Sequence, residues 1–129
     1  MAKVYTRVTF RFQSPFLSQK KMQPLLAIHG ACFLESPKSN VKTWALDSPL
    51  NEEKTLDEHI LSLRAILDKY TEAICELAKE IGRPNFFVSS YIFPDEEGCG
   101  SCLYLSGETV VFIHSLNADI QIDVMPSED

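Results

Sequence analysis

One apolar stripe, in residues 55–81, constrains the fold of this chain more than any other part of its sequence. Its members recur at alternating spacings of four and three, which is the period of one face of an α-helix. They are Leu56, Ile60, Leu63, Leu67, Tyr70, Ile74, Leu77 and Ile81. The segment contains no glycine or proline. We therefore predict one long helix, or two nearly collinear helices that bend around residues 68–70.

The ends and the flanks of the stripe indicate what the helix packs against. Thr55 and Glu58 form a capping box at its start, and Gly82 ends the helical pattern. The positions beside the stripe, where a coiled coil would carry paired charges, are partly apolar. They include Ile66, Ala73 and Ala78. This wider stripe favours a helix that lies across a sheet over a self-associating zipper.

Alternating and aromatic segments predict the strands of that sheet. We predict strands over residues 4–12, 41–46, 85–93, 102–105 and 118–125, shorter helices over 18–28 and 106–116, and a loop over 29–40. This order predicts an α+β two-layer sandwich: a mainly antiparallel sheet of four to five strands with helices on one face, of the ferredoxin-like or split β-α-β kind. The length of 129 residues predicts a single domain, residues 1–129, with a short acidic tail at 126–129.

Charge and composition narrow the classes of function. The chain has 12 Lys and Arg against 18 Asp and Glu, a net charge of −6. This charge argues against a protein that binds nucleic acid by neutralising phosphates, and it favours a basic partner. The N-terminus lacks the apolar core of a signal peptide, and no apolar run reaches the length of a membrane span. We expect a cytoplasmic protein with no membrane partner and with reduced cysteines.

Three patches of the chain together resemble a known family. They are Trp44-Ala45-Leu46-Asp47-Ser48, Leu56-Asp57-Glu58-His59-Ile60, and Leu105-Ser106 through Ala118-Asp119-Ile120-Gln121-Ile122-Asp123-Val124. These patches resemble a bacterial family known as domain of unknown function 4279. The resemblance implies a small α+β domain, and it brings no activity, cofactor or catalytic residue with it.

Cys99 and Cys102 have the spacing of half a zinc site or of a redox pair. A zinc site needs two more ligands, and the remaining cysteines and histidines form no second close pair. A redox pair would open a helix, where the dipole lowers the thiol pKa, whereas these thiols lie in a predicted hairpin turn. A metal-binding or metal-dependent protein that uses both thiols and a histidine is therefore the alternative. In the main interpretation we expect no cofactor and no metal.

The sheet face away from the predicted helices is the candidate binding surface. Tyrosine, phenylalanine and arginine, which are enriched in protein interfaces, alternate onto this face, and carboxylates flank them. The candidate partner-binding residues are Tyr5, Arg7, Arg11, Phe87, Tyr91, Phe93, Tyr104, Asp95, Glu96, Glu97, Asp119 and Asp123. Aromatic sheet faces also bind single-stranded RNA, but the negative charge of this chain opposes that use.

No catalytic motif accompanies this surface, because no nucleophile with a recognisable motif lies beside a histidine or carboxylate. We therefore predict a non-enzymatic protein-binding module. Its most concrete form is an immunity-type protein that neutralises a bacterial toxin, a basic nuclease, by covering the toxin's active site with carboxylates. A homodimer joined through the sheet face or the long helix is a further alternative.

Overall fold

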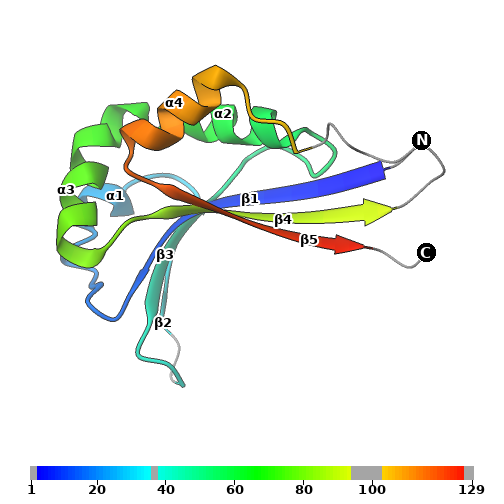
Figure 1. Ribbon diagram of the computed structural model, residues 1–129. Coiled ribbons are helices and arrows are strands. Elements are labelled where there is room, and N and C mark those ends of the chain that lie inside the picture. Colours follow the sequence, from blue (N-terminus) through cyan, green and yellow to red (C-terminus); the bar gives the residue numbers. More distant parts are fainter. Residues whose placement is uncertain (1–2, 36–37, 94–102, 127–129) are drawn as a thin grey trace.

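A five-stranded mixed sheet carries all the described helices on one face (Figure 1). The computed structural model describes residues 3–35, 38–93 and 103–126. The strands are β1 (Lys3–Ser14), β2 (Ala31–Glu35), β3 (Lys42–Asp47), β4 (Asn85–Phe93) and β5 (Asp119–Pro126). The helices are α1 (Gln23–Leu26), α2 (Leu56–Leu67), the 3₁₀ turn η1 (Asp68–Tyr70), α3 (Thr71–Ile81) and α4 (Gly107–Ser115).

The first strand lies at the centre of the sheet, whose order is β2-β3-β1-β4-β5. β1 pairs antiparallel with β3 from Thr9 to Ser14 and with β4 from Lys3 to Arg11. β5 runs parallel to β4 because α4 carries the chain back along the sheet between them. The predicted α+β sandwich is confirmed, and one of its strand pairs is parallel.

The apolar stripe forms the long helix that its spacing predicts. α2, η1 and α3 follow one another without a break, and the 3₁₀ turn gives the bend at residues 68–70. The Thr55 hydroxyl accepts the backbone N–H of Glu58 at 3.1 Å, so the predicted N-cap is present. The stripe faces the sheet, since Leu63, Leu67 and Ile74 are fully buried.

Four aromatic side chains from β1, β3 and β4 form the centre of the core. The ring of Phe10 lies 6.0 Å from that of Phe12, 6.1 Å from that of Trp44 and 4.9 Å from that of Phe86, measured between centroids. All four side chains are buried. Aromatic rings bury large apolar areas, so this cluster fixes the face of the sheet on which the helices pack.

Three expected elements differ from the structure. The loop predicted over 29–40 contains β2, whose backbone is satisfied by pairing with β3. The helix predicted over 18–28 is α-helical only in α1, whose second residue, Pro24, has no N–H with which to continue the helix toward the N-terminus. A strand was predicted over 102–105, but its described residues, 103–105, form no strand of the sheet. The Asp57 carboxylate holds the N–H of Ser106 at 2.8 Å and so keeps this segment beside α2.

Candidate functional site

The sheet face opposite the helices is bare in the part of the chain that the structure describes (Figure 1). We call it the outer face. The strand register places on it Tyr5, Arg7, Thr9 and Arg11 of β1, Phe87, Ser89 and Tyr91 of β4, and Asp119, Gln121 and Asp123 of β5. None of these side chains is buried. The outer face is therefore an accessible surface of aromatic rings and charges of both signs.

Arg11 and Phe87 form a fixed unit near the middle of the outer face. The guanidinium carbon of Arg11 lies 4.1 Å from the centroid of the Phe87 ring, and its Nε donates to Oδ1 of Asn85 at 2.9 Å. Partial burial lowers the pKa of Arg11, and the carboxylate of Asp123 acts in the opposite direction. The cation–π contact and the hydrogen bond together hold the guanidinium over the Phe87 ring.

Two ion pairs border this unit. Nη2 and Nε of Arg7 lie 2.6 Å and 2.7 Å from Oε1 of Glu52, and the hydrogen bond and charge of Glu52 raise the pKa of Arg7. Nη1 of Arg83 lies 3.3 Å from Oδ1 of Asp119. Both pairs are exposed, so water screens them and a partner can replace either member.

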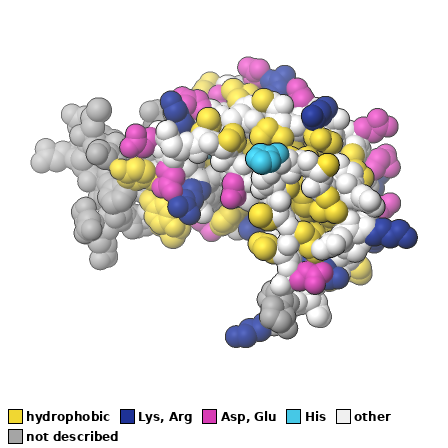
Figure 2. All heavy atoms as spheres, turned by 180° about the vertical axis from the view of Figure 1, so that it is seen from behind, with side chains coloured by type: hydrophobic (Ala, Val, Ile, Leu, Met, Phe, Trp, Pro, Cys, Tyr) yellow, Lys and Arg dark blue, Asp and Glu magenta, His cyan; other side chains and the backbone are white. Residues whose placement is uncertain are grey.

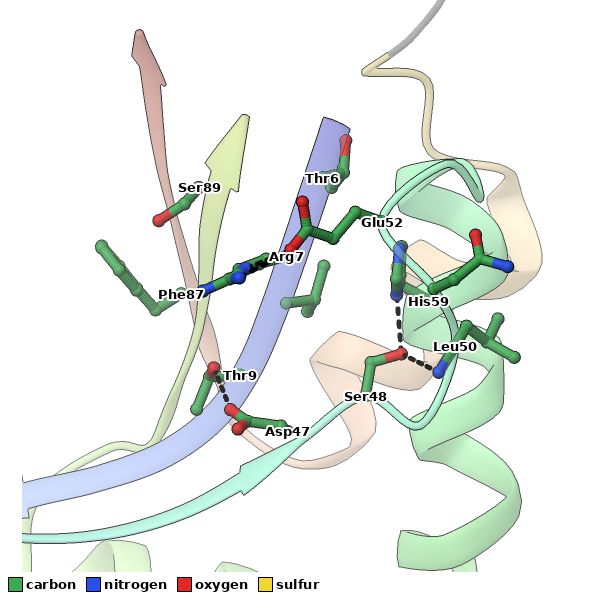
Figure 3. A pocket seen from close by; sticks show the side chains of 12 residues that line it. Thr6, Arg7, Thr9, Asp47, Ser48, Leu50, Glu52, His59, Phe87 and Ser89 are labelled. Atoms are coloured by element: carbon green, nitrogen blue, oxygen red, sulfur yellow. Dashed lines mark hydrogen bonds and ion pairs between the residues drawn. The ribbon is translucent and has the colours of Figure 1, made fainter. Parts of the chain in front are cut away.

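A cleft of about 730 Å³ opens where β3 leaves β1 (Figure 3). The loop at residues 48–52 replaces β3 along this edge. Its Ser48 N–H donates to the carbonyl oxygen of Val8 at 2.9 Å, and its Glu52 carbonyl oxygen accepts the N–H of Thr6 at 2.8 Å. Side chains of the outer face and of α2 both line the cleft, which therefore passes around the edge of β1.

His59, in the first turn of α2, is the buried ionisable side chain of this cleft, with 1% of its surface exposed. Its Nδ1 lies 2.6 Å from Oγ of Ser48, which lies 3.2 Å from Oγ of Ser62. The Ser62 hydroxyl donates to the backbone oxygen of His59 at 2.6 Å. Nε2 of His59 has no hydrogen-bond partner among the described residues. Burial lowers the pKa of His59, so the neutral imidazole is favoured.

The Ser48–His59 pair is suited to holding the loop at 48–52 against α2. A hydrolytic triad needs a carboxylate that orients the imidazole through its second nitrogen. No carboxylate of the described residues bonds to that nitrogen. The Ser48 oxygen also accepts the N–H of Leu50 at 3.2 Å, which ties it to its own loop.

A second cleft, of about 850 Å³, lies between the α1–β2 turn and the end of α2. Figure 2 shows hydrophobic side chains gathered on this rear side of the molecule, around a histidine. The apolar residues that line the second cleft include Ile28, Pro49, Ile66 and Tyr70, and the polar residues that line it include His29 and Lys69. The described residues contain no group of three or more His, Cys, Asp or Glu side chains placed to hold a metal.

The structure brings together seven of the predicted partner-binding residues: Tyr5, Arg7, Arg11, Phe87, Tyr91, Asp119 and Asp123. Tyr104 was expected on the same face, but it lies in the segment before α4, on the helix side, with 63% of its surface exposed. Phe93 is the last residue of β4, and the structure describes its backbone but not its side chain. Asp95, Glu96, Glu97, Cys99 and Cys102 lie outside the described residues.

Sequence reasoning missed Glu52 and the pairing of His59 with Ser48. Both depend on how the loop at 48–52 replaces a strand, and residue spacing carries no sign of that replacement. Alternation puts Asn85 on the same face as Arg11, but it does not set the register of β1 and β4 that places the two residues opposite each other.

Comparisons with known proteins address the family of this chain. No curated protein and no solved structure matches it. None of the described helices is long and apolar enough to span a membrane. The family model of a domain of unknown function, DUF4279, matches residues 18–127, which is nearly the whole chain. The protein therefore belongs to the DUF4279 family, as the three sequence patches indicated.

Proposed function

We propose that this protein is a non-enzymatic binding module that holds another protein on its outer face. The bare outer face is the observation that carries this proposal. It combines the Arg11–Phe87 unit with Tyr91, which is 40% exposed. Arginine and tyrosine are, with tryptophan, the residues that most often contribute large binding energies at protein interfaces.

The charge of the protein supports a basic partner. The net charge is −6, and exposed carboxylates of Asp47, Asp119 and Asp123 lie along the sheet. Opposite charge speeds the encounter of two proteins and aligns them as they meet. The outer face thus offers carboxylates for attraction and aromatic rings for retention.

The concrete form of this function is an immunity-type protein that neutralises a basic bacterial toxin, a nuclease. A nuclease gathers positive charge at its active site because its substrate is a polyanion. A surface with carboxylates around an aromatic centre can occupy such a site and exclude the nucleic acid. No reaction of the immunity-type protein itself is needed.

The experiment begins with the basic toxin domain encoded beside this gene in its native host. The two chains are purified separately, and the association and dissociation rates of the complex are measured by surface plasmon resonance at several salt concentrations. We expect a complex whose association rate falls as salt rises. If no basic domain encoded nearby binds the protein, the proposal is wrong.

A matched pair of tyrosine variants locates the interface. Tyr91→Ala removes a ring from the outer face, and Tyr104→Ala removes an exposed ring from the helix side. We expect Tyr91→Ala to weaken the complex by about thirtyfold, the effect of losing about 2 kcal/mol at a central interface residue. Tyr104→Ala should leave the affinity unchanged. If the two variants weaken the complex equally, the outer face is not the interface.

A further inference from the structure

β5 is a free edge of the sheet in the described part of the chain. It pairs with β4 on one side, and no described strand pairs with its other side. β5 is eight residues long, whereas β2, at the opposite edge, has five. Long edge strands present unpaired backbone groups that can take up another strand, and natural proteins usually block them.

The backbone groups that face this edge follow from one hydrogen bond. The N–H of Asp119 donates to the carbonyl oxygen of Pro84 at 3.0 Å, so Asp119 faces β4. In a parallel pair, alternate residues turn both their N–H and their C=O to the same side. Ile120, Ile122 and Val124 therefore direct their backbone groups to the free edge.

The side chains at this edge differ between the two faces of the sheet. Alternation along residues 118–125 predicts Ile122 and Val124 in the core on the helix side, but they are 38% and 46% exposed. The helices stop short of the C-terminal end of β5 (Figure 1). On the outer face, Asp119 and Asp123 are exposed. The edge is thus apolar on the helix side and acidic on the outer side.

We propose that β5 accepts an extended strand of the protein partner, which adds to the sheet as a sixth strand. The incoming strand would carry Lys or Arg on the outer face, beside Asp119 and Asp123, and apolar residues on the helix side, against Ile122 and Val124. Main-chain hydrogen bonds supply affinity in such strand additions, and alternate side chains supply specificity. The identity of the partner rests on the proposed function; the site on β5 does not.

The charge of β5 favours this occupant over a second copy of the chain. Two copies paired through β5 would bring four aspartates to one face of the joined strands, from two proteins that each carry −6. Like charges on neighbouring strands are destabilising, whereas opposite charges stabilise a cross-strand pair. A basic, alternating strand satisfies the backbone groups and the carboxylates together.

The first test uses the heptapeptide Lys-Val-Lys-Val-Lys-Val-Lys, blocked at both ends, and the same peptide with Glu in place of Lys. Backbone amide exchange of the full chain is followed by NMR with and without each peptide. We expect the lysine peptide to slow exchange at Ile120, Ile122 and Val124. Gln121 and Asp123 face β4 and should change little. The glutamate peptide should have no effect. Unchanged exchange at the three edge amides, or slowing without this alternation, would overturn the proposal.

The second test uses Ile122→Pro, with Ile122→Val as its control. Proline removes an N–H that faces the free edge, a position at which strands tolerate proline. We expect Ile122→Pro to weaken binding of the lysine peptide about tenfold, the effect of one lost hydrogen bond, and Ile122→Val to bind normally. Circular dichroism verifies that both variants fold. Equal binding by the two variants would rule out strand addition.

The two proposals fail in different ways. A toxin that depends on Tyr91 but not on the Ile122 N–H would remove the edge proposal and leave the proposed function standing. If the lysine peptide slows exchange at the edge but no toxin binds the protein, the proposed function is wrong and the strand-binding site on β5 stands. A dimer seen by light scattering that Ile122→Pro dissociates would make a second copy the occupant, and would overturn our assignment of a basic partner.

Discussion

We predict that the protein loses stability as the pH falls below about 6.5. Part of this loss comes from the buried imidazole of His59, and a substitution at this residue can measure that part. The imidazole is buried between α2 and the loop at 48–52, where its Nδ1 lies 2.6 Å from the Ser48 hydroxyl and its Nε2 has no hydrogen-bond partner in the described part of the chain. Burial lowers its pKa from the ordinary value of 6.5. The charge of Glu58 and the backbone groups of Asn51 and Thr6 act in the opposite direction but do not compensate.

The sign and size of the effect follow from proton binding. Below pH 6.5 the imidazole of the unfolded chain takes up a proton, whereas the buried one stays neutral until the pH reaches its lower pKa. Protons therefore favour the unfolded state in this window. The free energy of unfolding falls by up to about 1.4 kcal/mol for each pH unit, and the loss ends below the folded-state pKa.

Urea unfolding between about pH 8 and pH 5 measures this loss in the wild type and in His59→Gln. The carboxylates titrate in both proteins, so their contribution cancels in the difference between the two free energies. We expect the advantage of the wild type over His59→Gln to shrink as the pH falls below 6.5. His114→Gln, which removes an exposed imidazole, is the control and should follow the wild type. Parallel curves for the wild type and His59→Gln would refute the reasoning.

Three further variants test the packing and capping of the fold, each by urea or acid unfolding. Phe10→Ala removes the ring at the centre of the aromatic core and should cost about 3–5 kcal/mol; a loss below about 1 kcal/mol would contradict its central place. Thr55→Ala removes the N-cap of the long helix and should cost about 1 kcal/mol, with no change in m-value. For Asp57, burial raises the pKa, but hydrogen bonds from Thr109 and Ser106 outweigh it and the net pKa lies below 3.8. The wild type should therefore be more stable than Asp57→Asn above pH 3.8. It should lose this advantage as the pH falls through the lower pKa that Asp57 has in the folded state. An advantage that does not depend on pH would show that these hydrogen bonds do not need the charge of the carboxylate.

The long helix could be predicted because its signals are local. The spacing of the stripe, the cap at Thr55 and the stop at Gly82 all lie within the segment that they specify, and even the bend at residues 68–70 was found. β2 could not be predicted in the same way. A loop was predicted over 29–40, but the strand within that range is held by its pairing with β3. Such pairing depends on the neighbouring strand, and the segment itself does not encode it.

The candidate site shows the same division. Period-two alternation placed Arg7, Arg11, Phe87 and Tyr91 on the outer face, because successive side chains of a strand point to opposite sides. Tyr104 was misplaced because its predicted strand is in fact a segment held beside α2. The exposure of Ile122 and Val124 on the helix side was also missed, since the reach of the helix layer is a property of the whole fold.

The central position of β1 has a consequence for how the chain folds as it is made. The ribosome releases β1 well before β4, its hydrogen-bonded neighbour on one side: the Thr6 and Ser90 hydroxyls that meet at 3.1 Å are 84 residues apart in sequence. Contacts between segments this distant form slowly, because the intervening chain must first be ordered. Nascent chains that end before Asn85 therefore hold a long strand with one apolar face and one unpaired edge, and we expect them to depend on chaperones until β4 emerges.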